Sequence, residues 1–159
     1  MDKNTKQVMF SSKSNEWATP QSFFDKLDRI YGPFTLDAAA SADNYKVANH
    51  YTEADDSLSQ NWGSNTVFLN PPYGRNLKDW VKKSYEEGQK DGTTVVMLIP
   101  ARTDTKYWHD YVMKADEILF VRGRIKFGDE TNSAPFPSAV VVFRKTSFNG
   151  PRITGMERP

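Results

Sequence analysis

Four consecutive residues near the middle of the chain could hold an amino group against a flat ring: Asn70, Pro71, Pro72 and Tyr73. An asparagine side chain carries a carbonyl acceptor and an amide donor. The two prolines lack backbone N–H groups and fix φ, so the segment is stiff and its carbonyls are free for a ligand. Tyr73 adds an aromatic face. Rigid acceptors beside an aromatic plane suit the exocyclic amino group of a planar base.

The elements on either side of this Asn-Pro-Pro-Tyr segment favour a ligand site over a simple turn. Thr66–Leu69 is a β-branched and aromatic run typical of a buried strand. Leu77–Gln89 follows, with apolar residues at helical spacing. Open α/β sheets bind ligands on loops at the carboxyl ends of their strands. Asn-Pro and Pro-Pro pairs also occur in ordinary turns, so the four residues alone leave both interpretations open.

The remaining elements predict an α/β fold with a mainly parallel sheet and an antiparallel C-terminal strand. Thr19-Pro20 predicts a helix start, with Thr as the cap and Pro at the first helical position. That helix should end at Gly32-Pro33. Further strands are expected at 34–37, 93–99, 117–121 and 138–143, with a short helix around Tyr107 to Val112. We expect a flexible segment at 1–15, one domain at 16–146 and a loose tail at 147–159.

Composition narrows the classes of site that the chain can carry. The 159 residues suggest a single domain, and the charge is balanced at 21 basic against 20 acidic residues. Any basic surface must therefore be local. The chain has no cysteine and only two histidines, which excludes disulfides, thiolate sites and cysteine nucleophiles and predicts no metal site. No apolar run reaches membrane-spanning length, and we expect a soluble intracellular protein.

Two acidic segments could bind a nucleoside. Asp37 ends a predicted strand and is followed by the small residues Ala38, Ala39 and Ala40, which would let a ligand approach the backbone. A capped helix start explains the same pattern equally well. Asp55 and Asp56 could accept hydrogen bonds from a ribose or from an adenine amino group, although acidic runs are more often solvated loops.

Two basic segments could face a phosphate backbone. Arg102 and Thr103 follow the strongest predicted strand and so lie at the ligand edge, although Thr103 could instead cap the next helix. Arg122, Arg124 and Lys126 alternate with apolar residues, as in a strand beside a phosphate backbone. A solvated β-hairpin is the competing interpretation.

Taken together and in this order, these motifs resemble the small phage-type DNA N6-adenine methyltransferase (Dam) family, over roughly residues 15–145. The resemblance rests on Glu16-Trp17-Ala18-Thr19-Pro20, Leu36–Ala40, Asp55-Asp56 with Leu58, Trp62, Asn70–Gly74, Pro100–Thr105, Arg122-Gly123-Arg124 and Ala134–Ser138. It implies a Rossmann-like methyltransferase domain reduced in size, S-adenosylmethionine as the methyl donor and double-stranded DNA as the partner.

The resemblance also implies roles for individual residues. Asn70 and the Pro71 carbonyl would accept the two hydrogens of adenine N6, and Tyr73 would stack on the extruded base, with Pro72 completing the catalytic segment. The cofactor would meet Trp17, Thr19, Pro20, Asp37, Ala38, Ala39, Asp55, Asp56 and Asn70. The DNA would meet Arg75, Arg102, Thr103, Arg122, Arg124 and Lys126. Whether Asp55 or Asp56 meets ribose or adenine stays open.

Several alternatives stay open beside the adenine assignment. N4-cytosine methylation is the nearest, although such enzymes more often carry Ser-Pro-Pro-Tyr; amino groups of RNA or of protein glutamine are others. Cytosine C5 methylation ordinarily needs a cysteine, which the chain lacks. A non-catalytic nucleotide-binding or DNA-binding module is the alternative of a different class. We expect sequence recognition from loops 43–64, 102–106 and 122–137, and action in the cytoplasm of a bacterial or phage-infected cell. Monomer and homodimer are equally compatible with the sequence.

Overall fold

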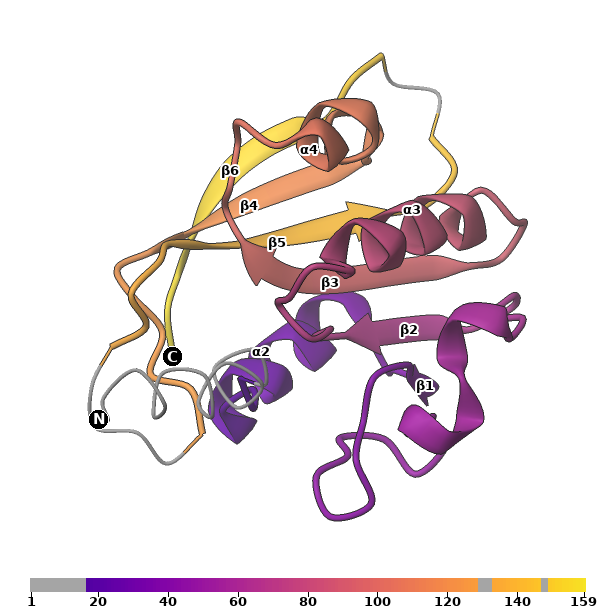
Figure 1. Cartoon of the computed structure of the whole chain (residues 1–159). Helices are drawn as coiled ribbons and strands as arrows, with labels where there is room; N and C mark the ends of the chain where they lie inside the picture. Colours follow the sequence, from indigo (N-terminus) through magenta and orange to yellow (C-terminus); the bar gives the residue numbers. More distant parts are fainter. Residues whose placement is uncertain (1–16, 129–132, 147–148) are drawn as a thin grey trace.

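A six-stranded sheet organises the computed structural model, which describes residues 17–128, 133–146 and 149–159. The strands lie in the order β1-β2-β3-β5-β4-β6 (Figure 1). They span Leu36–Asp37 (β1), Thr66–Leu69 (β2), Thr94–Pro100 (β3), Glu117–Arg122 (β4), Ser138–Phe143 (β5) and Arg152–Glu157 (β6). The pairs β1–β2, β2–β3 and β4–β6 are parallel, whereas β5 is antiparallel to both β3 and β4. The predicted α/β fold with a mainly parallel sheet is confirmed.

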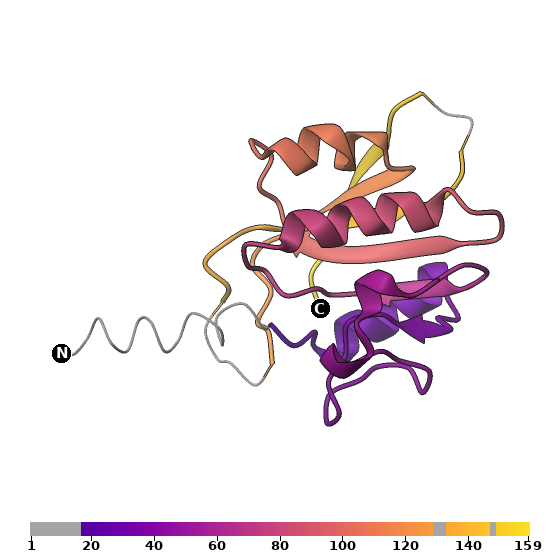
Figure 2. The ribbon, with the colours of Figure 1, turned by 45° about the vertical axis from the view of Figure 1, so that its right-hand side comes forward.

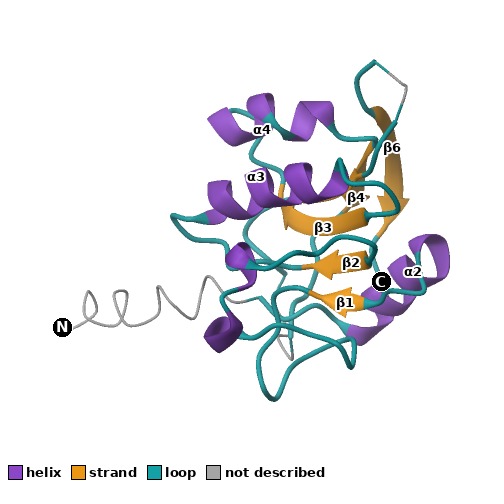
Figure 3. Cartoon of the chain, turned by 90° about the vertical axis from the view of Figure 1, so that its right-hand side faces the viewer, coloured by secondary structure: helices purple, strands orange, loops and turns teal. Residues whose placement is uncertain are grey.

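Helices cover both faces of this sheet. They span Gln21–Tyr31 (α2), Leu77–Gly88 (α3) and Lys106–Asp110 (α4), with single 3-10 turns at Glu53–Asp55, Ser57–Ser59 and Val112–Lys114. Figure 3 shows α3 and α4 on one side of the sheet and α2 on the other. Two-sided cover explains why β3 and β5 are buried along nearly their whole length and read as continuous apolar runs. Within the described residues, no helix is long and apolar enough to cross a membrane.

The start of α2 differs from the predicted cap. Pro20 precedes the first helical residue, and no side chain caps the helix. The Thr19 hydroxyl instead accepts a hydrogen bond from Asn70, 51 residues further along the chain. The Thr19 hydroxyl therefore bonds to the Asn70 amide instead of to a backbone N–H at the start of α2, and the predicted Thr19 cap is wrong. At the other end, the Gly32 amide donates to the Asp28 carbonyl at 2.8 Å, and the helix stops before Pro33, as predicted.

The C-terminal part of the chain is more ordered than the sequence suggests. The tail predicted to be loose contains β6, which pairs with β4 from Glu117↔Arg152 to Arg122↔Glu157. The strand was missed because it is an edge strand: five of its six residues are exposed, and only Met156 is buried. Its sequence therefore lacks the alternation of a half-buried strand. The predicted flexible segment at 1–15 lies outside the described residues.

The basic segment after β4 is also not the strand or hairpin that the sequence suggested. β4 ends at Arg122, and Gly123 takes a left-handed φ of 78°. The chain then continues without regular structure, anchored by the buried side chains of Ile125 and Phe127. The Gly128 amide donates to the Ala18 carbonyl at 2.8 Å. Figure 2 shows this orange segment running from the sheet to the start of the described chain.

Candidate active site

The side chain of Asn70 is oriented by three hydrogen bonds at the carboxyl end of β2. Its amide nitrogen donates to the Trp17 carbonyl and, at 2.8 Å, to the Thr19 hydroxyl. Its carbonyl oxygen accepts from the Tyr73 hydroxyl. A backbone carbonyl can only accept, so the Trp17 contact determines which end of the amide is nitrogen. Both N–H groups are then occupied, while the Asn70 oxygen keeps one lone pair for a ligand.

Tyr73 lies behind Asn70. Only 4% of Tyr73 is exposed, and its hydroxyl lies within hydrogen-bonding distance of both the Asn70 oxygen and the Leu98 carbonyl, the latter at 3.0 Å. Burial raises the pKa of Tyr73 well above its usual value, and the nearby positive charge of Arg102 offsets only part of this rise. The phenol therefore stays protonated and acts as a donor towards Asn70.

An aromatic cluster surrounds the Asn-Pro-Pro-Tyr segment. Tyr73 meets Phe127 and Phe136 edge to face, with ring centroids 6.3 and 5.7 Å apart. Trp17 meets the same two phenylalanines at 5.6 and 5.3 Å. Trp17 and Phe136 are half-buried, whereas Tyr73 and Phe127 are buried. In this arrangement the Tyr73 ring, predicted to stack on a base, is covered, and Trp17 and Phe136 are the more accessible rings.

The sequence reasoning did not single out Phe127 or Phe136 as site residues. Phe127 ends the basic segment after β4, and Phe136 stands between two prolines. In the sequence, Phe127 only follows the basic residues Arg122 to Lys126, and Phe136 only lies within the segment Ala134–Ser138; neither position by itself indicates a site residue. Their packing against Trp17 and Tyr73 joins three segments that are distant in the chain.

The prolines behave as their chemistry predicts. Within the described residues, the carbonyl of the buried Pro71 accepts no hydrogen bond, and neither proline has an N–H to offer. Pro72 is half-buried. The segment therefore presents a spare lone pair on the Asn70 side chain and an unpaired backbone carbonyl one residue later.

Asp37 organises its own loop. Its buried carboxylate accepts hydrogen bonds from the backbone amides of Lys46 at 2.9 Å and of Ala39 at 3.3 Å. Burial raises the pKa of Asp37, and these two hydrogen bonds lower it by less. No helix follows the acid, so the capped-helix alternative is wrong. Asp37 and the adjacent alanines lie beside β2, where the Ala38 amide donates to the Phe68 carbonyl at 3.1 Å.

The other acidic pair is exposed. Asp55 closes a capping box, because its carboxylate accepts from the Thr52 amide at 2.7 Å and from the Thr52 hydroxyl at 3.1 Å. Asp56 has a left-handed φ of 50°. Among the described residues, the Asn70 side chain has its hydrogen bonds with Trp17, Thr19 and Tyr73 and with neither of these acids.

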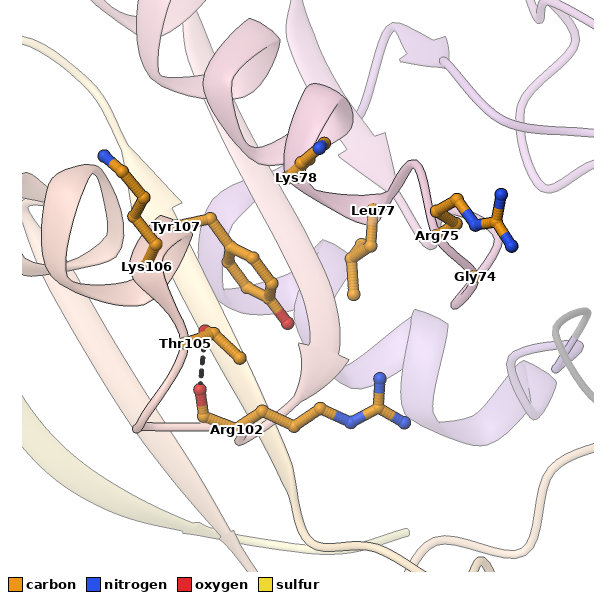
Figure 4. Close-up of a pocket in the computed structure, with 8 residues that line it drawn as sticks. All are labelled: Gly74, Arg75, Leu77, Lys78, Arg102, Thr105, Lys106 and Tyr107. Atoms are coloured by element: carbon orange, nitrogen blue, oxygen red, sulfur yellow. Dashed lines mark hydrogen bonds between the residues drawn. The ribbon is translucent and has the colours of Figure 1, made fainter.

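The predicted DNA-facing residues divide into two groups. Arg75 and Arg102 line one pocket of about 320 Å³, beside α3 and α4 (Figure 4). Thr103 is exposed next to it, and its carbonyl contacts the His109 ring nitrogen at 2.9 Å. The second group begins with the last residue of β4 and continues into the segment after it. Arg122 ends β4 and lies 3.7 Å from Glu157, Arg124 donates to the Ala134 carbonyl at 3.3 Å, and Lys126 is exposed.

The described residues contain no group of three histidine, cysteine, aspartate or glutamate side chains placed to hold a metal ion.

Comparison with known proteins identifies the family to which the chain belongs. The family described as DNA N-6-adenine-methyltransferase (Dam) matches residues 6–156. A DNA N-6-adenine-methyltransferase of Haemophilus phage HP1 (strain HP1c1) is 31% identical over 146 residues, covering 87% of this chain and 84% of the relative. A protein of the same name from Escherichia phage T1 is 35% identical over 106 residues, which is 66% of this chain and 44% of that longer relative. The chain therefore belongs to the DNA N-6-adenine-methyltransferase (Dam) family.

Proposed function

We propose that this protein transfers a methyl group from S-adenosylmethionine to N6 of an adenine that is turned out of double-stranded DNA. The observation that carries the proposal is the orientation of Asn70, whose amide N–H groups are both occupied and whose oxygen has a lone pair to spare. Family membership and the names of the phage relatives support adenine in DNA as the acceptor.

The chain's own residues would prepare the amino nitrogen for attack. An exocyclic amine conjugated to its ring is a poor nucleophile, because its lone pair is delocalised. The Asn70 oxygen and the Pro71 carbonyl, which has no donor among the described residues, would accept its two hydrogens and favour a tetrahedral nitrogen with an available lone pair. Tyr73 would keep Asn70 in place through its buried hydroxyl. Direct transfer needs no nucleophile from the protein, so positioning supplies much of the rate enhancement.

The residues near the end of β1 fit a nucleoside-type methyl donor. S-adenosylmethionine would supply an electrophilic methyl group on a sulfonium. The small side chains of Ala38–Ala40 leave the backbone approachable. Glu53 and Asp56 are exposed and have no ion pair within the described residues, so they can accept hydrogen bonds from ribose hydroxyls. We assign Trp17, Thr19, Pro20 and Asp37 to the wall of this site, and treat Asp55 as support because its carboxylate caps a turn.

The base would enter beside the aromatic cluster of Trp17, Tyr73, Phe127 and Phe136. Turning a base out of the duplex exposes its faces to stacking and its amino group to acceptors. The accessible rings of Trp17 and Phe136 are suited to the first contact. The basic group at Arg75 and Arg102 and the basic group that begins at Arg122 would hold the DNA backbone on either side of the base. The reaction would take place in the cytoplasm, where host or phage DNA is present.

Label transfer tests this proposal. Purified protein is incubated with methyl-labelled S-adenosylmethionine and duplex DNA, and the DNA is digested to nucleosides. We expect label in N6-methyl-2′-deoxyadenosine, and a loss of about 100-fold or more on Asn70→Ala, as for removal of a charge-stabilising group in other enzymes. Asn76→Ala is the matched control, since Asn76 is exposed and its side chain makes no capping bond.

Each outcome decides a different part of the proposal. Label in N4-methylcytosine would overturn the adenine assignment, and no label in any DNA would overturn the activity. Full turnover by the Asn70→Ala protein would remove Asn70 from the acceptor role.

A further inference from the structure

The pocket beside the Asn-Pro-Pro-Tyr segment gathers four basic side chains, of which three have no acidic partner among the described residues. Its lining includes four basic side chains, two directly after the motif and two after β3: Arg75, Lys78, Arg102 and Lys106. Lys106 pairs with Asp110 at the rim. Within the described residues, the other three have no carboxylate within 4.0 Å, and no acidic residue lines the pocket. For a chain with a net charge of +1, this is a strong local concentration of charge.

The rest of the lining suits a sugar-phosphate group. Leu77 and the half-buried ring of Tyr107 form an apolar wall, while the Thr105 hydroxyl donates to the Arg102 carbonyl at 2.8 Å and so holds the loop that carries Arg102. Figure 4 shows the Tyr107 ring between the Lys106 and Leu77 sides of the pocket, with the Arg102 side chain running below it towards Arg75. Arginine can meet two phosphate oxygens at once, and lysine adds a mobile point charge.

The pocket is also adjacent to the candidate active site. Gly74 follows Tyr73 directly and lines the pocket. Arg102 reaches it from the loop after β3, whose Leu98 carbonyl contacts the Tyr73 hydroxyl at 3.0 Å. An anion bound here would therefore lie next to the segment that is proposed to hold the reacting amino group.

We propose that this pocket binds one DNA backbone phosphate flanking the extruded adenosine, with Lys78 joining Arg75 and Arg102 as its ligands. The inference rests on the proposed function, since it names the part of the substrate that this side of the site holds. A phosphate contact positions the strand without reading its sequence. Its job would be to keep the turned-out nucleotide in register with Asn70.

Two matched variants test the pocket without any methyl donor present. Lys78→Gln removes one charge from the lining, and Lys82→Gln removes one charge from the exposed surface of the same helix, outside the lining. Binding of a duplex oligonucleotide is measured over a range of salt concentrations. We expect the slope of log K against log salt to fall by about 0.9 for Lys78→Gln, the value for one phosphate contact. Lys82→Gln should keep the wild-type slope.

A second measurement locates the phosphate. Single phosphates around the methylated adenine are replaced, one at a time, by uncharged methylphosphonate. The wild-type protein should lose affinity at one flanking position, and Lys78→Gln should be indifferent to that same replacement. An equal slope for the wild type and Lys78→Gln, or the absence of any such position, would overturn the inference. So would stabilisation by inorganic phosphate that depends on Lys78 while DNA binding does not, which would indicate a free-anion site.

These results are separable from the proposed activity. Binding that depends on Lys78, without methyl transfer to any DNA, would defeat the enzyme proposal and leave the phosphate pocket standing. Methyl transfer with an unchanged salt slope for Lys78→Gln would do the reverse.

Discussion

Thr19→Val isolates the hydrogen bond that links the start of the described chain to the candidate catalytic amide. Valine has nearly the shape of threonine but replaces the hydroxyl with a methyl group. Thr19 is only 5% exposed, and its hydroxyl accepts from the Asn70 amide at 2.8 Å. After the change, Asn70 keeps the Trp17 carbonyl as an acceptor, but its second N–H faces a methyl group.

The size of the effect follows from this geometry. A net hydrogen bond contributes about 0.5–1.5 kcal/mol, and a buried donor without a partner costs about 1–3 kcal/mol. Asn70 is half-buried, so water can reach part of its amide, and we expect a loss of about 1 kcal/mol. The melting temperature should fall by about 2–4 °C for a domain of this size. If the same loss of about 1 kcal/mol instead appears in the activation free energy, because the Asn70 oxygen is misplaced, kcat should fall about fivefold.

The assay measures initial rates of methyl incorporation at saturating duplex DNA and methyl donor, beside thermal unfolding of the same samples. Thr19→Ser is the control, because it keeps the oxygen and loses only the methyl group. We expect the serine variant to turn over close to the wild-type rate. Equal kcat for the wild type, Thr19→Ser and Thr19→Val would refute the reasoning that Thr19 orients Asn70. A loss in Thr19→Ser with a wild-type rate in Thr19→Val would assign the effect to packing of the methyl group, which valine retains.

Three further changes test how the fold is held together. Removing β6 should lower the unfolding free energy by about 2 kcal/mol or more, because Met156 loses its burial against the core; an unchanged denaturation midpoint would restore the loose-tail prediction. Gly88→Ala should destabilise by about 1–3 kcal/mol in urea unfolding, since the new Cβ would lie 2.7 Å from the Phe143 Cβ; wild-type stability would show that α3 can move away from β5. Asp116→Asn should lower the unfolding free energy at pH 7 by about 1–3 kcal/mol. Burial raises the pKa of Asp116, but the hydrogen bond and the positive charge of Arg144 outweigh burial, so the folded-state pKa lies below its ordinary value. This contribution is present above pH 3.8 and is lost as the pH falls through the lower folded-state pKa, so the two unfolding curves should converge in acid; a constant gap at all pH values would contradict it.

Elements with strong local patterns were predictable from the sequence. The strand Thr66–Leu69 and the strand Ser138–Phe143 have the predicted bounds, and the helix that starts at Leu77 ends one residue early, at Gly88. Their apolar residues recur at the spacing of the element that they form. β6 carries no such pattern, since it is held by pairing with β4, whose partner residues lie 35 positions earlier in the chain.

The candidate site divides in the same way. By itself, the sequence determined the chemistry on offer: an amide and a proline carbonyl on a stiff segment, an adjacent phenol, and no cysteine to support another methylation route. Only the tertiary structure decided how these groups are arranged. Asn70 is oriented by Trp17, 53 residues away; the Tyr73 ring is covered by Phe127 and Phe136 instead of being open to a base. The physical reason is that hydrogen-bond partners and ring contacts depend on which segments the sheet brings side by side, and no local spacing encodes that.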